Sequence, residues 1–107
     1  MADVLQMYKE AFRLFAGGQL DAAIDAYRKV LEIDPDHALT YQGLSEAHAR
    51  RGDLDSAIEA IRRAIEIEPG EGLYHTSLSR FLQRQGKIPE AEEAAARAAQ
   101  AQAGSKH

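Results

Sequence analysis

The side chains best suited to chemistry in this sequence are four histidines and a serine that precedes one of them by three residues: His37, His48, His75, His107 and Ser45. Histidine is a common metal ligand, and a histidine beside a serine can activate the hydroxyl as a nucleophile. No two of the histidines have the i, i+4 spacing that places two ligands on one helix face. No third residue is placed to orient His48 toward Ser45. We therefore expect neither a metal site nor a catalytic site.

Two glycine clusters are candidates for phosphate binding. Gly70-Glu71-Gly72 lacks the preceding strand and the further glycine of a phosphate-binding loop, and Gly17-Gly18-Gln19 fits a turn. The chain contains no cysteine, which excludes disulfides, thiol nucleophiles and thiolate metal sites. The sequence therefore predicts a protein that is not an enzyme and needs no cofactor.

The composition limits the remaining classes of function. The 107 residues are 45% hydrophobic and 28% charged, which is typical of one packed domain and not of a disordered chain. The net charge of -4 argues against nucleic acid as a partner. The longest apolar run is three residues, and the first residues lack a leader pattern. We expect no membrane insertion and a cytoplasmic location.

The sequence repeats with a period of 34 residues. Equivalent residues recur in three columns: Gly18, Gly52 and Gly86; Ala23, Ala57 and Ala91; Pro35 and Pro69. The register does not slip, so the chain divides into repeats 4–37, 38–71 and 72–105. We expect a single domain over 1–107, with a short disordered tail at 104–107.

Each repeat contains two stretches with apolar residues at helical spacing, as in 41–48 and 54–65. The glycine column lies between the two stretches, where a helix end commonly needs a residue that tolerates positive φ. Asp21 and Asp55 are suited to capping second helices, and Asp36 and Glu71 to opening first helices. No strand pattern is present. The predicted fold class is all-α, with three antiparallel helix pairs.

This pattern resembles the tetratricopeptide repeat (TPR) family, whose repeat is also 34 residues long. The second repeat matches best, with the residues Tyr41, Leu44, Ser45, His48, Ala57, Ile61, Ala64 and Pro69 in the family's columns. The family prefers there a large aromatic, Leu, a small residue, an aromatic, Ala, an aromatic, Ala and Pro. The resemblance covers nearly the whole chain. It implies a right-handed superhelical stack, an alpha-alpha solenoid, whose concave wall is the row of first helices.

The resemblance also implies which residues face the concave groove. The partner-binding candidates are Leu5, Tyr8, Phe12, Phe15, Leu39, Gln42, Glu46, Arg50, Leu73, Thr76, Arg80 and Arg84. This groove is aromatic at its N-terminal end and basic at its C-terminal end, and the three leucines form an apolar row along one rim. Glu46 is expected to neutralise Arg50 partly from four residues away, whereas Arg80 and Arg84 have no acidic partner on their own helix.

These residues predict a non-enzymatic protein-protein interaction module. Its partner would be a protein or peptide, bound through a peptide or helical segment that is apolar with acidic residues. A chaperone-like adaptor that holds a client segment is a variant of this function. Co-chaperones of the family grip a C-terminal carboxylate with Lys, Asn, Asn, Lys and Arg. The matching positions here are Tyr8, Phe12, Gly43, Leu73 and Ser77, so a receptor for chaperone tails is not expected.

A second hypothesis is self-assembly into a homo-oligomer or scaffold. Eight of the thirteen residues from Ala91 to Ala103 are alanine, which favours a helix but buries little area. The aromatic N-terminal groove and this alanine-rich helix would then contact other copies of the chain. A two-fold contact would close, whereas a head-to-tail contact could extend.

Overall fold

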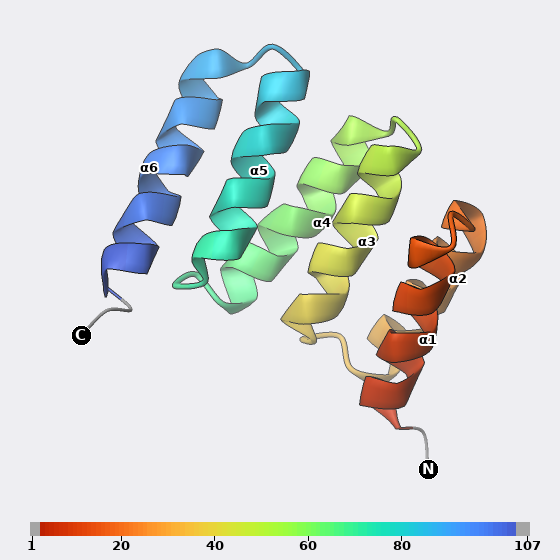
Figure 1. Ribbon diagram of the computed structural model, residues 1–107. Helices are drawn as coiled ribbons and strands as arrows, with labels where there is room; N and C mark the ends of the chain where they lie inside the picture. Colours follow the sequence, from red (N-terminus) through yellow and green to blue (C-terminus); the bar gives the residue numbers. More distant parts are fainter. Residues whose placement is uncertain (1–2, 105–107) are drawn as a thin grey trace.

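A computed structural model describes residues 3–104, and the regular elements in that range are all helices (Figure 1). They are α1 (Val4–Ala16), α2 (Leu20–Ile33), α3 (Ala38–Arg50), α4 (Leu54–Ile67), α5 (Gly72–Arg84) and α6 (Ile88–Gly104). Helix α6 includes Gly104, and the rest of the tail expected at 104–107 lies outside the described residues. None of the described helices has the length and hydropathy needed to span a membrane.

The six helices form three antiparallel pairs, α1 with α2, α3 with α4, and α5 with α6. Helix α2 also packs against α3, and α4 against α5, which joins the pairs into one stack. In Figure 1 the first helices of the pairs, α1, α3 and α5, lie side by side in the foreground, and α2 and α4 lie behind them. The predicted all-α stack of three antiparallel helix pairs is confirmed.

Each pair turns at a glycine with a left-handed backbone. Gly18, Gly52 and Gly86 have φ angles of 80°, 86° and 78°. A residue with a Cβ atom pays about 1 to 2 kcal/mol in this conformation, which explains why glycine recurs at the turn in every repeat.

The second helices begin earlier than their predicted caps. Asp55 lies in the first turn of α4, and the N-cap is Asp53, whose carboxylate accepts a hydrogen bond from the Ser56 backbone N–H at 3.1 Å. Helix α2 follows Gln19, which makes no side-chain cap, and Asp21 lies in its first turn. The prediction of Asp21 and Asp55 as caps is therefore wrong. Both carboxylates still lie in a first turn, where the positive end of the helix dipole stabilises them.

The first helices differ from each other in the same respect. Helix α5 begins at the predicted acidic residue, because the Glu71 carboxylate accepts a hydrogen bond from the Leu73 N–H at 3.2 Å. Helix α3 begins after His37 and not after Asp36, and His37 makes no side-chain cap to the backbone.

The core consists of small residues where helices approach and larger residues between them. The buried small residues form two repeated columns: Ala11, Ser45 and Ser79; Ala23, Ala57 and Ala91. Tyr27, Ile61 and Phe81 are among the largest fully buried side chains. Because α3 contributes to both apolar clusters of the core, the second pair connects the first pair to the third.

The two ends of the stack differ in polarity. On α1, Gln6, Lys9 and Arg13 are exposed, although the residues 34 positions later, Thr40, Gly43 and Ala47, are buried inside the stack. The N-terminal end is therefore closed by polar side chains.

The C-terminal end carries a groove between α5 and α6, lined by Thr76, Ser79, Arg80, Gln83, Ala95, Ala98, Ala99 and Gln102. One repeat earlier, the equivalents of two of these residues, Ile61 and Ala64, pack in the core with Tyr74 and Phe81 of α5. On the second pair, the equivalent surface is covered by the next first helix, α5. On the third pair, it is the groove between α5 and α6.

Candidate functional site

The twelve predicted partner-binding residues all lie on the first helices α1, α3 and α5. Eight of them are exposed: Leu5, Phe12, Leu39, Arg50, Leu73, Thr76, Arg80 and Arg84. The other four are half-buried: Tyr8, Phe15, Gln42 and Glu46. We refer to this row of side chains on the three first helices as the inner wall.

The aromatic residues of α1 form a connected cluster. The ring centroids of Tyr8 and Phe12 are 6.4 Å apart, and those of Phe12 and Phe15 are 6.1 Å apart. Tyr8 also lies against Tyr27 of α2 at 5.8 Å and against His37 at 6.0 Å, so it packs toward α2 and the start of α3 as well. Burial raises the pKa of the Tyr8 phenol above its ordinary value, so this ring stays neutral. Phe12 remains 50% exposed and is the aromatic residue most available to a partner.

One arginine of the inner wall, Arg50, contacts the aromatic cluster. The Arg50 guanidinium on α3 lies 4.3 Å from the centroid of the Phe15 ring on α1. A guanidinium over an aromatic face is attracted by the ring quadrupole. This contact holds the Arg50 side chain in place while leaving its charge without an ion pair among the described residues.

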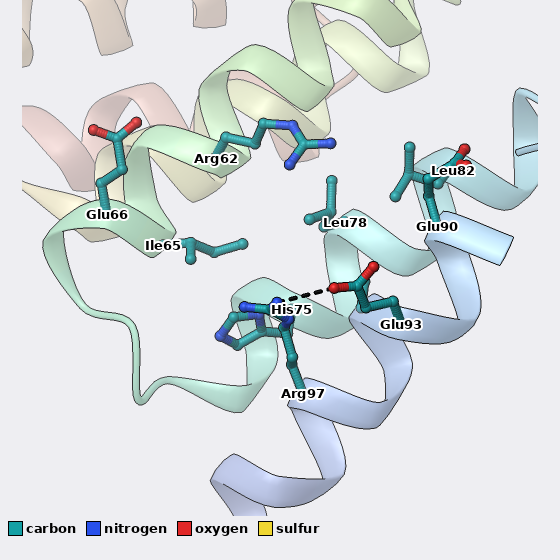
Figure 2. A pocket seen from close by; sticks show the side chains of 10 residues that line it. Arg62, Ile65, Glu66, His75, Leu78, Leu82, Glu90, Glu93 and Arg97 are labelled. Carbon is teal, nitrogen blue, oxygen red and sulfur yellow. Dashed lines mark hydrogen bonds and ion pairs between the residues drawn. The ribbon is translucent and has the colours of Figure 1, made fainter.

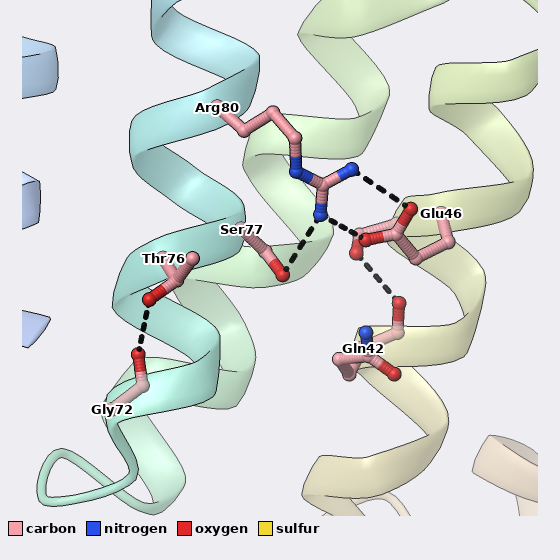
Figure 3. A network of polar contacts seen from close by, with 7 residues as sticks. Gln42, Glu46, Gly72, Thr76, Ser77 and Arg80 are labelled. Atoms are coloured by element: carbon pink, nitrogen blue, oxygen red, sulfur yellow. Dashed lines mark hydrogen bonds and ion pairs between the residues drawn. The ribbon is translucent and has the colours of Figure 1, made fainter. Parts of the chain in front are cut away.

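Glu46 neutralises a different arginine from the one expected. The Arg80 guanidinium on α5 donates to both Glu46 carboxylate oxygens on α3, at 2.7 Å and 3.4 Å (Figure 3). Arg80 also donates to the Ser77 hydroxyl at 3.4 Å. The expectation that Glu46 offsets Arg50 is wrong, because the carboxylate turns toward the neighbouring repeat and not along its own helix.

Of the other polar candidates, Thr76 bonds within its own helix through its hydroxyl, and Gln42 does so through its backbone carbonyl. The Thr76 hydroxyl donates to the Gly72 carbonyl at 3.1 Å, and the Ser45 hydroxyl donates to the Gln42 carbonyl at 2.6 Å (Figure 3). The Thr76 hydroxyl proton is therefore already used.

The leucine row occupies the opposite end of the first helices from the arginines. Leu5, Leu39 and Leu73 are each the second residue of α1, α3 and α5, and their exposed fractions are 53%, 39% and 51%. Arg50 and Arg84 lie in the last turns of α3 and α5. The inner wall is thus apolar along one edge and basic along the other.

A second groove lies on the outer side of the stack and is not part of the sequence prediction. Arg62 and Ile65 of α4, His75 and Leu78 of α5, and the ion pair of Glu93 with Arg97 on α6 line it (Figure 2). A groove of the same kind lies between α2, α3 and α4, and eight of its residues are those 34 positions earlier: Arg28, Tyr41, Leu44, His48, Ser56, Glu59, Ala60 and Arg63. Recurrence of Arg28 as Arg62, and of Glu59 as Glu93, is the sequence signal that could have indicated it.

Two of the histidines that could suggest chemistry, His48 and His75, are buried side chains. His48 and His75 are 6% and 5% exposed, and each has a buried Nδ1 without a hydrogen-bond partner among the described residues. His75 bonds through Nε2 to the Pro69 carbonyl at 2.8 Å, which makes Nε2 the protonated nitrogen. In the described range, 3–104, no three acidic or histidine side chains gather as a metal site would require.

A stack of helix pairs with a continuous wall of first helices defines an α-solenoid. A tetratricopeptide repeat model matches residues 14–80, more than half of the chain. The protein therefore belongs to the tetratricopeptide repeat family, which confirms the resemblance seen in the sequence.

Solved structures show the same fold. The chain is 24% identical to MamA, with a TM-score of 0.93 over 97% of this chain and 61% of that one. It is 19% identical to the first TPR of Spaghetti (RPAP3) bound to the HSP90 peptide SRMEEVD, with a TM-score of 0.88 over 92% of this chain and 78% of that one. For the type III secretion translocator chaperone SycD of Yersinia enterocolitica, the identity is 20% and the TM-score 0.88, over 92% and 73%. A comparison with curated protein sequences found no match.

Proposed function

We propose that the protein is a non-enzymatic, cytoplasmic interaction module that holds a peptide or helical segment of a partner protein against its inner wall. The observation that carries this proposal is the exposure of large apolar side chains there: Leu5, Phe12 and Leu73 are each half exposed or more. Aromatic and arginine side chains are the residues that most often dominate binding energy at protein interfaces. The partner segment is apolar with acidic residues, because the charges on the inner wall that have no described ion pair are those of arginines.

The structural neighbours support an interaction role. The residues of the inner wall differ, however, from the carboxylate clamp that co-chaperones of the family use. The RPAP3 domain holds a peptide ending in acidic and apolar residues, SRMEEVD. In the present chain the positions of the family's carboxylate clamp carry Tyr8, Phe12, Gly43, Leu73 and Ser77, none of which can pair with a carboxylate as lysine or arginine does. We propose that this groove holds an internal segment by its side chains and does not grip a C-terminal carboxylate.

A display library of random peptides tests the proposal. Peptides selected on the wild-type protein should lose binding to Phe12→Asp and Leu39→Asp, because the first change places a charge in the aromatic cluster and the second places one in the apolar edge of the inner wall. A matched variant, Ile33→Asp, changes an exposed apolar residue of α2 that is 50% exposed and should bind the same peptides as wild type. Failure to select any peptide that is sensitive to Phe12→Asp would refute the inner wall as a binding surface.

A second candidate function is self-assembly through the same aromatic end and through α6. The exposed alanines Ala95, Ala96 and Ala99 leave one face of α6 without a partner helix in this chain, and SycD has been solved in an alternative dimer. Light scattering after size exclusion, over about a hundredfold range of concentration, separates the two functions because self-association follows mass action. A mass fixed near 11.8 kDa excludes assembly, whereas a mass that rises with concentration and falls in Phe12→Asp favours it.

A further inference from the structure

The charge of the inner wall is not spread evenly over its arginines. Arg80 is neutralised by both oxygens of Glu46 and is also held by Ser77 (Figure 3). Arg50 and Arg84 are exposed, and within residues 3–104 neither forms an ion pair. An incoming carboxylate would have to displace Glu46 to reach Arg80, but it could approach Arg50 and Arg84 directly.

Arg50 and Arg84 lie at equivalent positions of two neighbouring first helices, α3 and α5. Glu46 on α3 and Arg80 on α5 are 34 positions apart, and their side chains meet at 2.7 Å. Arg50 and Arg84 are also 34 positions apart, and each stands four residues, about one helical turn, beyond Glu46 and Arg80 on the same two helices. The Arg50 guanidinium lies over Phe15 of α1, on the other side of α3 from α5, so Arg50 and Arg84 are two separate cations along the same edge of the inner wall.

Neither arginine has a carboxylate partner among residues 3–104, so each can attract an acidic side chain of an incoming segment. Glu46 cannot serve both, because its oxygens face Arg80. The Arg50 side chain is also held in place by Phe15, with 4.3 Å between guanidinium and ring centroid, so less side-chain freedom is lost on binding. Arg50 is thus preorganised to meet a carboxylate, and Arg84 is a second exposed cation on the same edge.

The apolar edge lies opposite. Leu39 and Arg50 are eleven residues apart on α3, as are Leu73 and Arg84 on α5, a separation of about 16 Å along a helix. A segment that lies across the first helices therefore has its apolar side on the leucines and its other side on the arginines.

We propose that Arg50 and Arg84 together form the acid-recognition element of the groove, and that the partner segment carries an apolar edge and an acidic edge. This inference rests on the proposed function and specifies the chemistry of its ligand. Arg80 serves instead to fix α5 against α3.

Synthetic peptides with one leucine edge and one glutamate edge test this assignment. Two forms are used, a stapled helix and an extended form containing proline, each beside a version with Gln in place of every Glu. At least one glutamate peptide should bind about tenfold tighter than its Gln version, and added salt should reduce the difference. The Arg50→Gln/Arg84→Gln variant should abolish the preference, and Arg50→Lys/Arg84→Lys should restore part of it because the charge is kept.

The matched control is Arg28→Gln/Arg62→Gln, which removes two exposed arginines that are also 34 positions apart but lie on α2 and α4, outside the inner wall. It should retain the preference for glutamate, and circular dichroism verifies that each variant is folded. The assignment is wrong if Arg50→Gln/Arg84→Gln keeps the preference, if the control loses it, or if neither glutamate peptide is preferred. Peptides from the display library that need Phe12 but carry no acidic residues would overturn this inference and leave the proposed function intact.

Discussion

A large buried ring in the first pair is compensated by a missing side chain in the second. Tyr27 on α2 is fully buried, and a Cβ atom at Gly43 on α3 would lie 2.6 Å from its Cζ atom. One repeat later the same two positions hold Ile61 and Ser77, both fully buried. The two side chains of each pair together fill a similar volume, although the larger share comes from Tyr27 in the first case and is divided more evenly in the second. Close packing of the core requires this balance.

Gly43→Ser should therefore destabilise the protein by about 1 to 3 kcal/mol, because the fully buried Tyr27 ring cannot move aside. Adding Tyr27→Ile should recover much of that loss, since the double variant reproduces the Ile61 and Ser77 pair. Urea unfolding of the two single variants and the double variant gives the coupling energy. Additive effects would show that the two positions do not share one space.

A histidine in the second pair makes stability depend on pH. Burial lowers the pKa of the His48 imidazole, Asp53 and Glu59 oppose this effect, and Arg28 and Arg51 add to it. The unfolded chain then takes up a proton at His48 before the folded chain does. Stability is complete above the ordinary histidine pKa of about 6.5 and falls as the pH drops below it.

Replacement of His48 by leucine provides the test, because the equivalent position of the third repeat is Leu82. The free energy of unfolding of His48→Leu, measured from pH 7.5 to 5, should fall less steeply than that of wild type. One proton accounts for at most about 1.4 kcal/mol per pH unit. Parallel curves for the two proteins would mean that His48 does not cause the loss.

Turn geometry between helices is decided one residue at a time. Gly17 has φ of −81° and Gly18 has φ of 80°, so adjacent glycines have opposite requirements. Gly18→Ala should destabilise by about 1 to 2 kcal/mol, because alanine is strained at positive φ. Gly17→Ala is the matched control and should be neutral or slightly stabilising, since its Cβ would meet only ordinary contacts at 3.5 Å and beyond. Thermal unfolding of both variants checks the difference, and equal effects would contradict it.

The 34-residue period predicts all six helices because it combines apolar spacing with a glycine that only a turn requires. The helix starts at Asp53 and Gln19 are less predictable, because several polar residues at each start could cap it. The sequence is enough to place the inner wall residues on their helices. It is not enough to predict which side chains they bond to. Glu46 has Arg50 one turn away and Arg80 in the next repeat, and only the stacking distance shows that it bonds to Arg80.

Stability is distributed unevenly along the whole molecule. Helix α6 packs against α5, and its buried residues are the alanines Ala91, Ala94 and Ala98. The corresponding helix α4 lies between two first helices and buries Ile61. In a repeat stack each unit is held by its neighbours, so a terminal helix that buries only small side chains opens first.

Amide hydrogen exchange should show this order directly. Amides in the C-terminal half of α6 should exchange fastest among the helices, and those of α3 and α4 slowest. Binding of a peptide to the inner wall should slow amide exchange in α1, α3 and α5. Dimerisation through the alanine face should instead slow exchange in α6. Equal protection of α6 and α4 in the monomer would contradict the expected order.

The contrast between the polar N-terminal end and the groove on the third pair gives this repeat array a direction of growth. A duplicated 34-residue unit appended after α6 would meet a groove in the position that holds α5 on the second pair. The same unit placed before α1 would have to bury Lys9 and Arg13. Gene duplication can therefore lengthen such a chain at its carboxyl end with few further substitutions, whereas growth at the amino end requires those charges to be replaced first.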